Sequence, residues 1–163
     1  MDAAPIYDPA TYGLTAQQAA LIASAQQLAA DKFAPRAARY DREASFPTDN
    51  YRDLHAAGLL AICIPQSHGG LGADYRTYAL AAAEIARHCG ATALTWNMHV
   101  CSTLWAGPLA DDLQMDDATR AERERRRAIH FRRIAVDGAI SIKHPQEAKP
   151  RPRDSLWGPL APG

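Results

Sequence analysis

Alanine is the residue that most constrains the fold of this chain, because it occupies 34 of the 163 positions. It has the best helix propensity and little side-chain bulk, so this composition favours closely packed helices over sheets. A chain of this length buries roughly 70% of the surface that its unfolded form exposes. We therefore expect one all-α domain that needs neither a disulfide nor a metal ion for its stability.

Charge and cysteine content exclude several classes of protein. Lys and Arg total 18 and Asp and Glu total 18, so bulk attraction to nucleic acid or to an acidic membrane does not organise this chain. Cys63, Cys89 and Cys101 form no C-x-x-C pair, and we interpret them as reduced core thiols of a cytoplasmic protein. We expect no secretory signal and no transmembrane helix, since a basic, apolar leader and an 18-residue apolar run are both missing.

Start and stop signals predict about five helices. Thr15 and Gln18 form a capping box, and Pro35 should end or kink the helix that starts there. Gly58 suits the end of a second helix, and Asp74 suits the start of a third that runs to about residue 89. Two more helices are expected, one that ends at Gly107 and one over about 118–136.

The two ends of the chain differ in composition from its middle. Residues 1–13 contain Pro5, Pro9 and Gly13 and are interpreted as an irregular lead-in to a helical domain over 14–140. Residues 141–163 are rich in proline and arginine and poor in large apolar side chains. We expect this segment to be a disordered tail.

The fourth predicted helix has two contrasting faces. One carries apolar side chains at positions i, i+4, i+7 and i+11, a seam that we predict to be buried: Leu94, Met98, Cys101 and Trp105. The other face carries Trp96, His99 and Thr103, a mixture typical of a pocket wall, and we predict these three as substrate-pocket residues. An equally good alternative is that Trp96 and His99 pack against a further domain. In either case we expect this face to be exposed here and to promote weak self-association.

A glycine-dense turn, His68-Gly69-Gly70-Leu71-Gly72, is the most distinctive local motif. An esterase oxyanion loop would need a G-x-S-x-G elbow and a P-loop would need a Lys-Ser/Thr pair, and the chain contains neither. We therefore interpret Gly69, Gly70 and Gly72 as structural, supplying positive φ angles to a tight connection. The pairs His88-Cys89 and His99-x-Cys101 lack a second pair at ligand spacing, so no metal site is predicted.

Seven arginines lie between residues 120 and 133 and raise the question of nucleic-acid binding. Glu122 and Glu124 dilute their charge, and Phe131 is the sole aromatic side chain among them apart from His130. A solvated helix face is the favoured interpretation, and nucleic acid is an unlikely partner. A helical binding module that uses these arginines stays open as an alternative.

Several stretches, taken in order, resemble the N-terminal helical domain of the flavin-dependent acyl-CoA dehydrogenases. The resemblance covers about residues 14–140. Its most specific part is Ile64-Pro65-Gln66-Ser67-His68-Gly69-Gly70-Leu71-Gly72, which is similar to the Val-Pro-Glu-x-x-Gly-Gly-x-Gly signature of that family. The other matching stretches are Phe33-Ala34-Pro35-Arg36-Ala37, Asp41 with Phe46-Pro47, Leu54-His55-Ala56-Ala57-Gly58-Leu59, Glu84-Ile85-Ala86-Arg87 and Asn97-Met98-His99.

The resemblance implies FAD as cofactor, an acyl-CoA thioester as substrate, and a β-domain and a C-terminal helical bundle as further parts of the protein. The catalytic glutamate of the family has no counterpart here, so no catalytic residue is assigned. The likeness stops near Ile140, before the flavin-contacting motif of the β-domain, and a fragment, a truncated product and an altered reading frame all explain this. The chain alone is expected to be inactive. Flavin-dependent monooxygenases share the fold and are the alternative activity.

Overall fold

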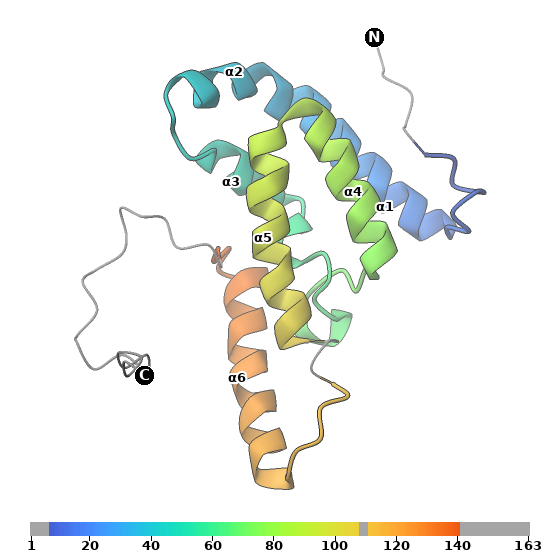
Figure 1. The fold of residues 1–163 in the computed structure, drawn as a ribbon, viewed down its shortest axis with the longest axis vertical. Helices are drawn as coiled ribbons and strands as arrows, with labels where there is room; N and C mark the ends of the chain where they lie inside the picture. Colours follow the sequence, from blue (N-terminus) through green and yellow to red (C-terminus); the bar gives the residue numbers. More distant parts are fainter. Residues whose placement is uncertain (1–6, 108–110, 141–163) are drawn as a thin grey trace, which may run out of the picture.

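The computed structural model describes residues 7–107 and 111–140 of the chain (Figure 1). These ranges contain six α-helices and no β-strand, which confirms the predicted all-α fold. Two of the six form one kinked helix, so the expected number of about five agrees with the structure. The predicted tail over 141–163 lies outside the described residues, as do residues 1–6 and 108–110.

The first helix begins where the capping box predicts and bends next to Pro35. Thr15 Oγ accepts from the backbone N–H of Gln18 at 3.2 Å, and Gln18 Oε1 accepts from the N–H of Thr15 at 2.9 Å. A π-helical turn follows and leaves Pro35 in the first turn of the next helix, where its missing N–H costs no hydrogen bond. The parts of this segment are α1 (Ala16–Leu28), the π turn η1 (Ala29–Phe33) and α2 (Ala34–Arg42).

The middle of the chain alternates helices with tight 3₁₀ turns. Gly58 adopts a left-handed φ of +72° just beyond the end of a helix, as its position in the sequence predicts. Asp74 caps the following long helix, because its carboxylate accepts from the backbone N–H of Thr77 at 2.9 Å. The elements are α3 (Thr48–Ala56), η2 (Leu59–Ala61), η3 (Gln66–His68) and α4 (Tyr75–His88).

The last two helices are α5 (Gly90–Ala106) and α6 (Asp117–Ala135). Gly90 opens α5 rather than closing the helix before it. α4 packs between α1 and α5, whereas α6 packs on η2 and η3 and extends away from the other helices in Figure 1. The domain is therefore a group of packed helices with one long helix attached at the end where the glycine turn lies.

One hydrophobic core joins α1, α3, α4, α5 and α6 through the turn region η2. Its largest fully buried side chains include one or more from each of these elements: Ile22, Phe33, Leu54, Leu59, Leu60, Ile85, Trp96 and Phe131. Since η2 is buried on all sides, its backbone carbonyl groups need hydrogen-bond donors from neighbouring helices.

The prediction of which face of α5 is buried was wrong. Leu94, Met98 and Trp105 are 65%, 58% and 73% exposed, and Cys101 is only partly buried. Trp96, His99 and Thr103, expected to be exposed, are at most 1% exposed. The premise that this chain self-associates through Trp96 therefore fails too.

Hydrogen bonds to η2 explain why the face of α5 that carries Trp96, His99 and Thr103 is the buried one. Trp96 Nε1–H donates to the carbonyl oxygen of Leu59 at 3.1 Å, and His99 Nε2 lies 3.0 Å from that of Leu60. Thr103 satisfies its own hydroxyl by donating to the carbonyl oxygen of Val100 at 2.7 Å. A side chain with an apolar ring and one N–H can pack in the core and also donate a hydrogen bond to a buried carbonyl group. Leucine and methionine can pack there but have no hydrogen to donate.

Candidate functional site

The glycine turn connects η3 to α4 and is closed by its own backbone. The N–H groups of Gly70, Leu71 and Gly72 donate to backbone carbonyl oxygens at 3.2, 3.1 and 2.8 Å. The N–H groups of Gly69 and Ala73 do the same at 3.0 and 2.8 Å. A turn whose amides are all engaged in this way does not offer them to a phosphate, so it does not fit the pyrophosphate of a flavin nucleotide.

The three glycines of this turn serve different geometrical needs. Gly69 and Gly72 have φ angles of +83° and +65°, in the left-handed region that glycine tolerates best. Gly70 has no positive φ, contrary to the expectation for all three. A Cβ at Gly70 would lie 2.1 Å from the carbonyl oxygen of Ile64, so this position requires the close approach of two backbone segments.

The predicted pocket residues Trp96, His99 and Thr103 come together on one face of α5, but that face points into the core. The ring of Trp96 meets Tyr78 edge-on at a centroid distance of 5.5 Å. Burial lowers the pKa of His99, because the core disfavours the charged ring. Any contact of these side chains with a substrate stays a prediction.

The opposite face of α5 carries a row of exposed apolar side chains, which we call the α5 stripe: Leu94, Met98 and Trp105. Asn97 lies beside the stripe and accepts a hydrogen bond from the Tyr78 hydroxyl. Burial raises the pKa of that hydroxyl. Large apolar side chains gathered on one exposed helix face are typical of a contact surface.

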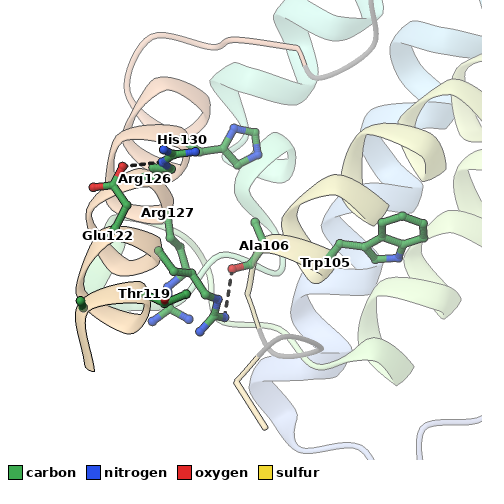
Figure 2. Close-up of a pocket in the computed structure, with 9 residues that line it drawn as sticks. Trp105, Ala106, Thr119, Glu122, Arg126, Arg127 and His130 are labelled. Atoms are coloured by element: carbon green, nitrogen blue, oxygen red, sulfur yellow. Dashed lines mark hydrogen bonds and ion pairs between the residues drawn. The ribbon is translucent and has the colours of Figure 1, made fainter. Parts of the chain in front are cut away.

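A groove of about 750 Å³ lies between the end of α5 and α6 (Figure 2). No motif in the sequence predicts this groove, although the dense mixture of acids and arginines in α6 is visible there. Burial and the charge of Arg133 together lower the pKa of His130, which faces this groove. The residues around the groove include Trp105, Ala106, Ala118, Thr119, Arg126 and His130.

The arginines of α6 are largely engaged in ion pairs within the chain. Arg125 and Arg126 both pair with Glu122, at 2.8 and 2.6 Å, and these two guanidinium groups hold the pKa of that carboxyl at about 2. Arg123 and Arg127 pair with Asp111 at 3.0 and 2.6 Å. This pairing agrees with a solvated helix face and gives no support to a nucleic-acid interface.

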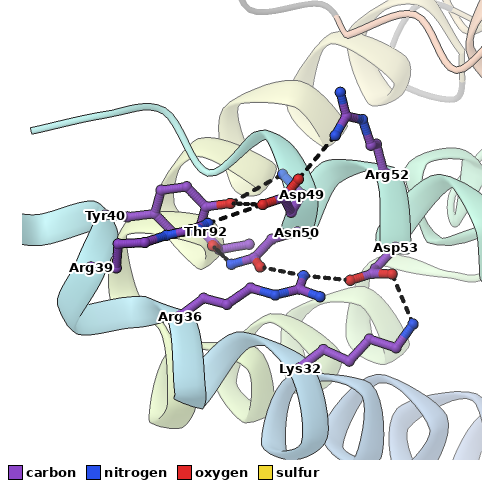
Figure 3. Close-up of polar contacts among 9 residues, drawn as sticks. All are labelled: Lys32, Arg36, Arg39, Tyr40, Asp49, Asn50, Arg52, Asp53 and Thr92. Atoms are coloured by element: carbon purple, nitrogen blue, oxygen red, sulfur yellow. Dashed lines mark hydrogen bonds and ion pairs between the residues drawn. The ribbon is translucent and has the colours of Figure 1, made fainter. Parts of the chain in front are cut away.

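A second polar cluster joins η1, α2, α3 and α5 (Figure 3). Arg36 and Lys32 pair with opposite oxygens of Asp53 at 2.6 and 2.8 Å. Burial acts to raise the pKa of Asp53, but these two cations hold it below its ordinary value. Buried Asn50 donates to Thr92 Oγ on α5 at 2.9 Å. Because its members satisfy one another, we interpret this cluster as a structural clamp.

Within residues 7–107 and 111–140, no group of three His, Cys, Asp or Glu side chains lies close enough together to hold a metal ion. Among the helices that the structure describes, none is long and apolar enough to cross a membrane.

The all-helical fold agrees with that of an acyl-CoA dehydrogenase N-terminal domain. The family model for the "Acyl-CoA dehydrogenase, N-terminal domain" matches residues 15–111. This chain belongs to the acyl-CoA dehydrogenase family, and the resemblance seen in its sequence is confirmed.

Named relatives match the same region. The mitochondrial short-chain specific acyl-CoA dehydrogenase of Homo sapiens is 36% identical over 89 residues, 55% of this chain and 21% of that protein. The probable acyl-CoA dehydrogenase YngJ of Bacillus subtilis is 33% identical over 98 residues, 60% of this chain and 25% of that protein. Cyclohex-1-ene-1-carbonyl-CoA dehydrogenase of Syntrophus aciditrophicus is 42% identical over 82 residues, 50% and 20% of the two proteins. The matched region therefore spans a fifth to a quarter of these relatives.

Proposed function

We propose that this chain is the N-terminal helical domain of an FAD-dependent acyl-CoA dehydrogenase, which oxidises an acyl-CoA thioester. The observation that carries the proposal is the family match over residues 15–111. The names of the relatives support the substrate class, because several of them are dehydrogenases of acyl-CoA or of a cyclic carbonyl-CoA. They favour this activity over the flavin-dependent monooxygenase alternative. FAD, when bound to the whole protein, would accept the hydride.

The role of this chain would be to present the α5 stripe and the glycine-turn region to the rest of the protein. Because Trp96, His99 and Thr103 are buried, they are not available for such a contact. The α5 stripe is the exposed face of this helix and could contact an acyl chain or another domain. No residue of this chain is given a catalytic role. We expect the 163-residue chain alone to bind no stoichiometric flavin and to be inactive.

Two experiments test the proposal. The purified chain should be colourless and should not reduce an electron acceptor when an acyl-CoA is added, with or without added FAD. A yellow preparation with stoichiometric flavin would contradict the inactivity.

A chimera tests the function itself. In it, the matched N-terminal region of the human short-chain enzyme is replaced by residues 15–111 of this chain. We expect a flavin-containing protein with acyl-CoA-dependent acceptor reduction. A chimera that folds and holds flavin but reduces no acceptor with short-, medium- or long-chain acyl-CoA would contradict the proposed function.

A further inference from the structure

Two arginines of α6 share one carboxylate at the end of α5. Arg123 Nη2 lies 3.0 Å and Arg127 Nη1 lies 2.6 Å from the same oxygen, Oδ1 of Asp111. Both arginine side chains are largely buried, at 17% and 15% exposure, whereas that of Asp111 is 53% exposed. Two guanidinium groups this close together need anions beside them, and the chain supplies Asp111 and also Glu124, which lies 3.5 Å from Arg123 and 2.5 Å from Arg127.

Other contacts hold both guanidinium groups in place without Asp111. Arg123 Nη2 also donates to the carbonyl oxygens of Ala106 and Gly107, at 3.4 and 3.2 Å, where α5 ends. Arg127 Nη2 pairs with Glu124 one turn earlier on α6. The cationic site is therefore preorganised by the backbone of α5 and by α6, which lowers the entropic cost of binding a ligand.

Asp111 does not satisfy this site completely. Asp111 uses a single oxygen for both arginines. A phosphate group in the place of Asp111 could give each arginine an acceptor oxygen of its own, and it carries up to two negative charges where the carboxylate carries one.

Asp111 is also a replaceable partner. It lies outside every helix, between α5 and α6, and more than half of its side chain is in water. Moving this carboxylate fully into solvent should therefore cost little free energy, because ion pairs of exposed carboxylates are weak. Beside the arginine pair, the groove of Figure 2 is lined by Ala106, Ala118 and Thr119. The polar side chains of Glu122, Arg126 and His130 line it as well.

We propose that Arg123 and Arg127 bind the phosphate group of a small phosphate monoester whose apolar part lies in the groove, and that Asp111 occupies this site when the ligand is absent. The proposal does not rest on the proposed dehydrogenase function, because neither arginine belongs to the glycine turn or to the α5 stripe. Free phosphate presents the same chemistry, and the experiment separates the two sources.

The test is calorimetric titration of the purified 163-residue chain with inorganic phosphate and with hexyl phosphate, at constant ionic strength adjusted with chloride. Asp111→Asn removes the competing charge and should lower the Kd for both ligands by about tenfold or more. Asp112→Asn is the matched control, since it removes the same charge from the next residue, and it should bind as the wild type does. Arg127→Lys, which removes the fork and Nε, should raise the Kd of the Asp111→Asn protein by about tenfold.

Equal Kd values for Asp111→Asn and Asp112→Asn, or unchanged binding in the Arg127→Lys protein, would overturn the proposal. If hexyl phosphate binds no tighter than inorganic phosphate, the ligand is not a phosphate monoester, and free phosphate is the ligand of this site. If Asp111→Asn does not fold, the wild-type chain decides by NMR titration. Amide resonances of Ala106, Gly107 and residues 119–127 must then shift first, and shifts centred elsewhere, or none, would overturn the site.

Discussion

The two faces of α5 depart from the usual relation between side-chain polarity and burial. The inner face presents a histidine and a threonine together with Trp96, whereas the outer face presents Leu94, Met98 and Trp105 to solvent. The inner face is buried because two of its ring N–H groups can satisfy the carbonyl groups of η2. The outer face has no described partner element to cover it. Burial in α5 thus follows the hydrogen bonds that a buried turn requires, and hydrophobicity alone does not decide it.

This comparison separates the side chains that stabilise this chain from those that serve a contact. Substitutions on the inner face should change the free energy of unfolding. Substitutions on the α5 stripe should change solubility or association and leave stability nearly unaltered.

The largest effect is expected for Trp96→Ser. It removes a fully buried aromatic side chain and the hydrogen bond that its Nε1–H donates to the carbonyl oxygen of Leu59. The cost should be about 3–5 kcal/mol, a large part of the stability of a typical domain. Urea unfolding followed by circular dichroism measures it. The matched control is Trp105→Ser, on the stripe, and equal losses in the two variants would contradict the distinction between the faces.

Gly70→Ala tests whether the glycine turn is packed against the backbone of Ile64 as tightly as the structure indicates. A Cβ there would lie 2.1 Å from the carbonyl oxygen of Ile64, and backbone must move to accept it. We expect a loss of about 3 kcal/mol in the free energy of unfolding. Gly90→Ala is the control at the start of α5, where a Cβ meets nothing within 4 Å. It should leave stability unchanged or raise it by up to about 1 kcal/mol.

The fold was predictable from the sequence because its signals are local. Thr15 with Gln18, Gly58 and Asp74 each mark a helix end through contacts within a few residues, and all three are confirmed. The orientation of α5 was not predictable in this way, since it depends on hydrogen bonds between residues 37 and 39 positions apart. A helical wheel identifies two faces and cannot say which one meets buried carbonyl groups.

The candidate sites were likewise only partly predictable from the sequence. The glycine turn was visible as a motif, but the reason for Gly70 required the position of Ile64 in space. The groove and its arginine pair were not predictable, because Asp111 lies in the connection before α6, 16 residues away from Arg127 in the sequence. Their charges alone predicted only a solvated helix face.

The inner face should also make stability depend on pH. Burial lowers the pKa of His99 below its value of 6.5 in an unfolded chain. Below about pH 6.5 the unfolded chain therefore binds a proton that the folded chain does not, and stability falls as the pH falls. Each such proton contributes a slope of up to about 1.4 kcal/mol per pH unit. Urea unfolding between about pH 7.5 and 5, the range in which an ordinary histidine titrates, measures this slope.

His130 contributes to the same slope, since burial and Arg133 lower its pKa as well. His99→Gln should be less stable than wild type at neutral pH and should have a shallower pH dependence. His130→Gln should reduce the slope with a smaller loss at neutral pH, because this side chain is only partly buried. A slope that neither variant alters would mean that the buried histidine is not the titrating group.

The smallest effect on stability is expected for Met98→Asp at the centre of the α5 stripe. A buried seam would have made this substitution cost several kcal/mol, because an unpaired charge would enter the core. Met98 is 58% exposed, so the charge stays in water and the expected change is about 0.5 kcal/mol, mainly from helix propensity. Sedimentation should show less self-association than in the wild type if the stripe brings copies of the chain together. A loss of several kcal/mol that depends on protein concentration would instead show that the stripe is already buried against a second copy, and the two faces of α5 would then both belong to the folded assembly.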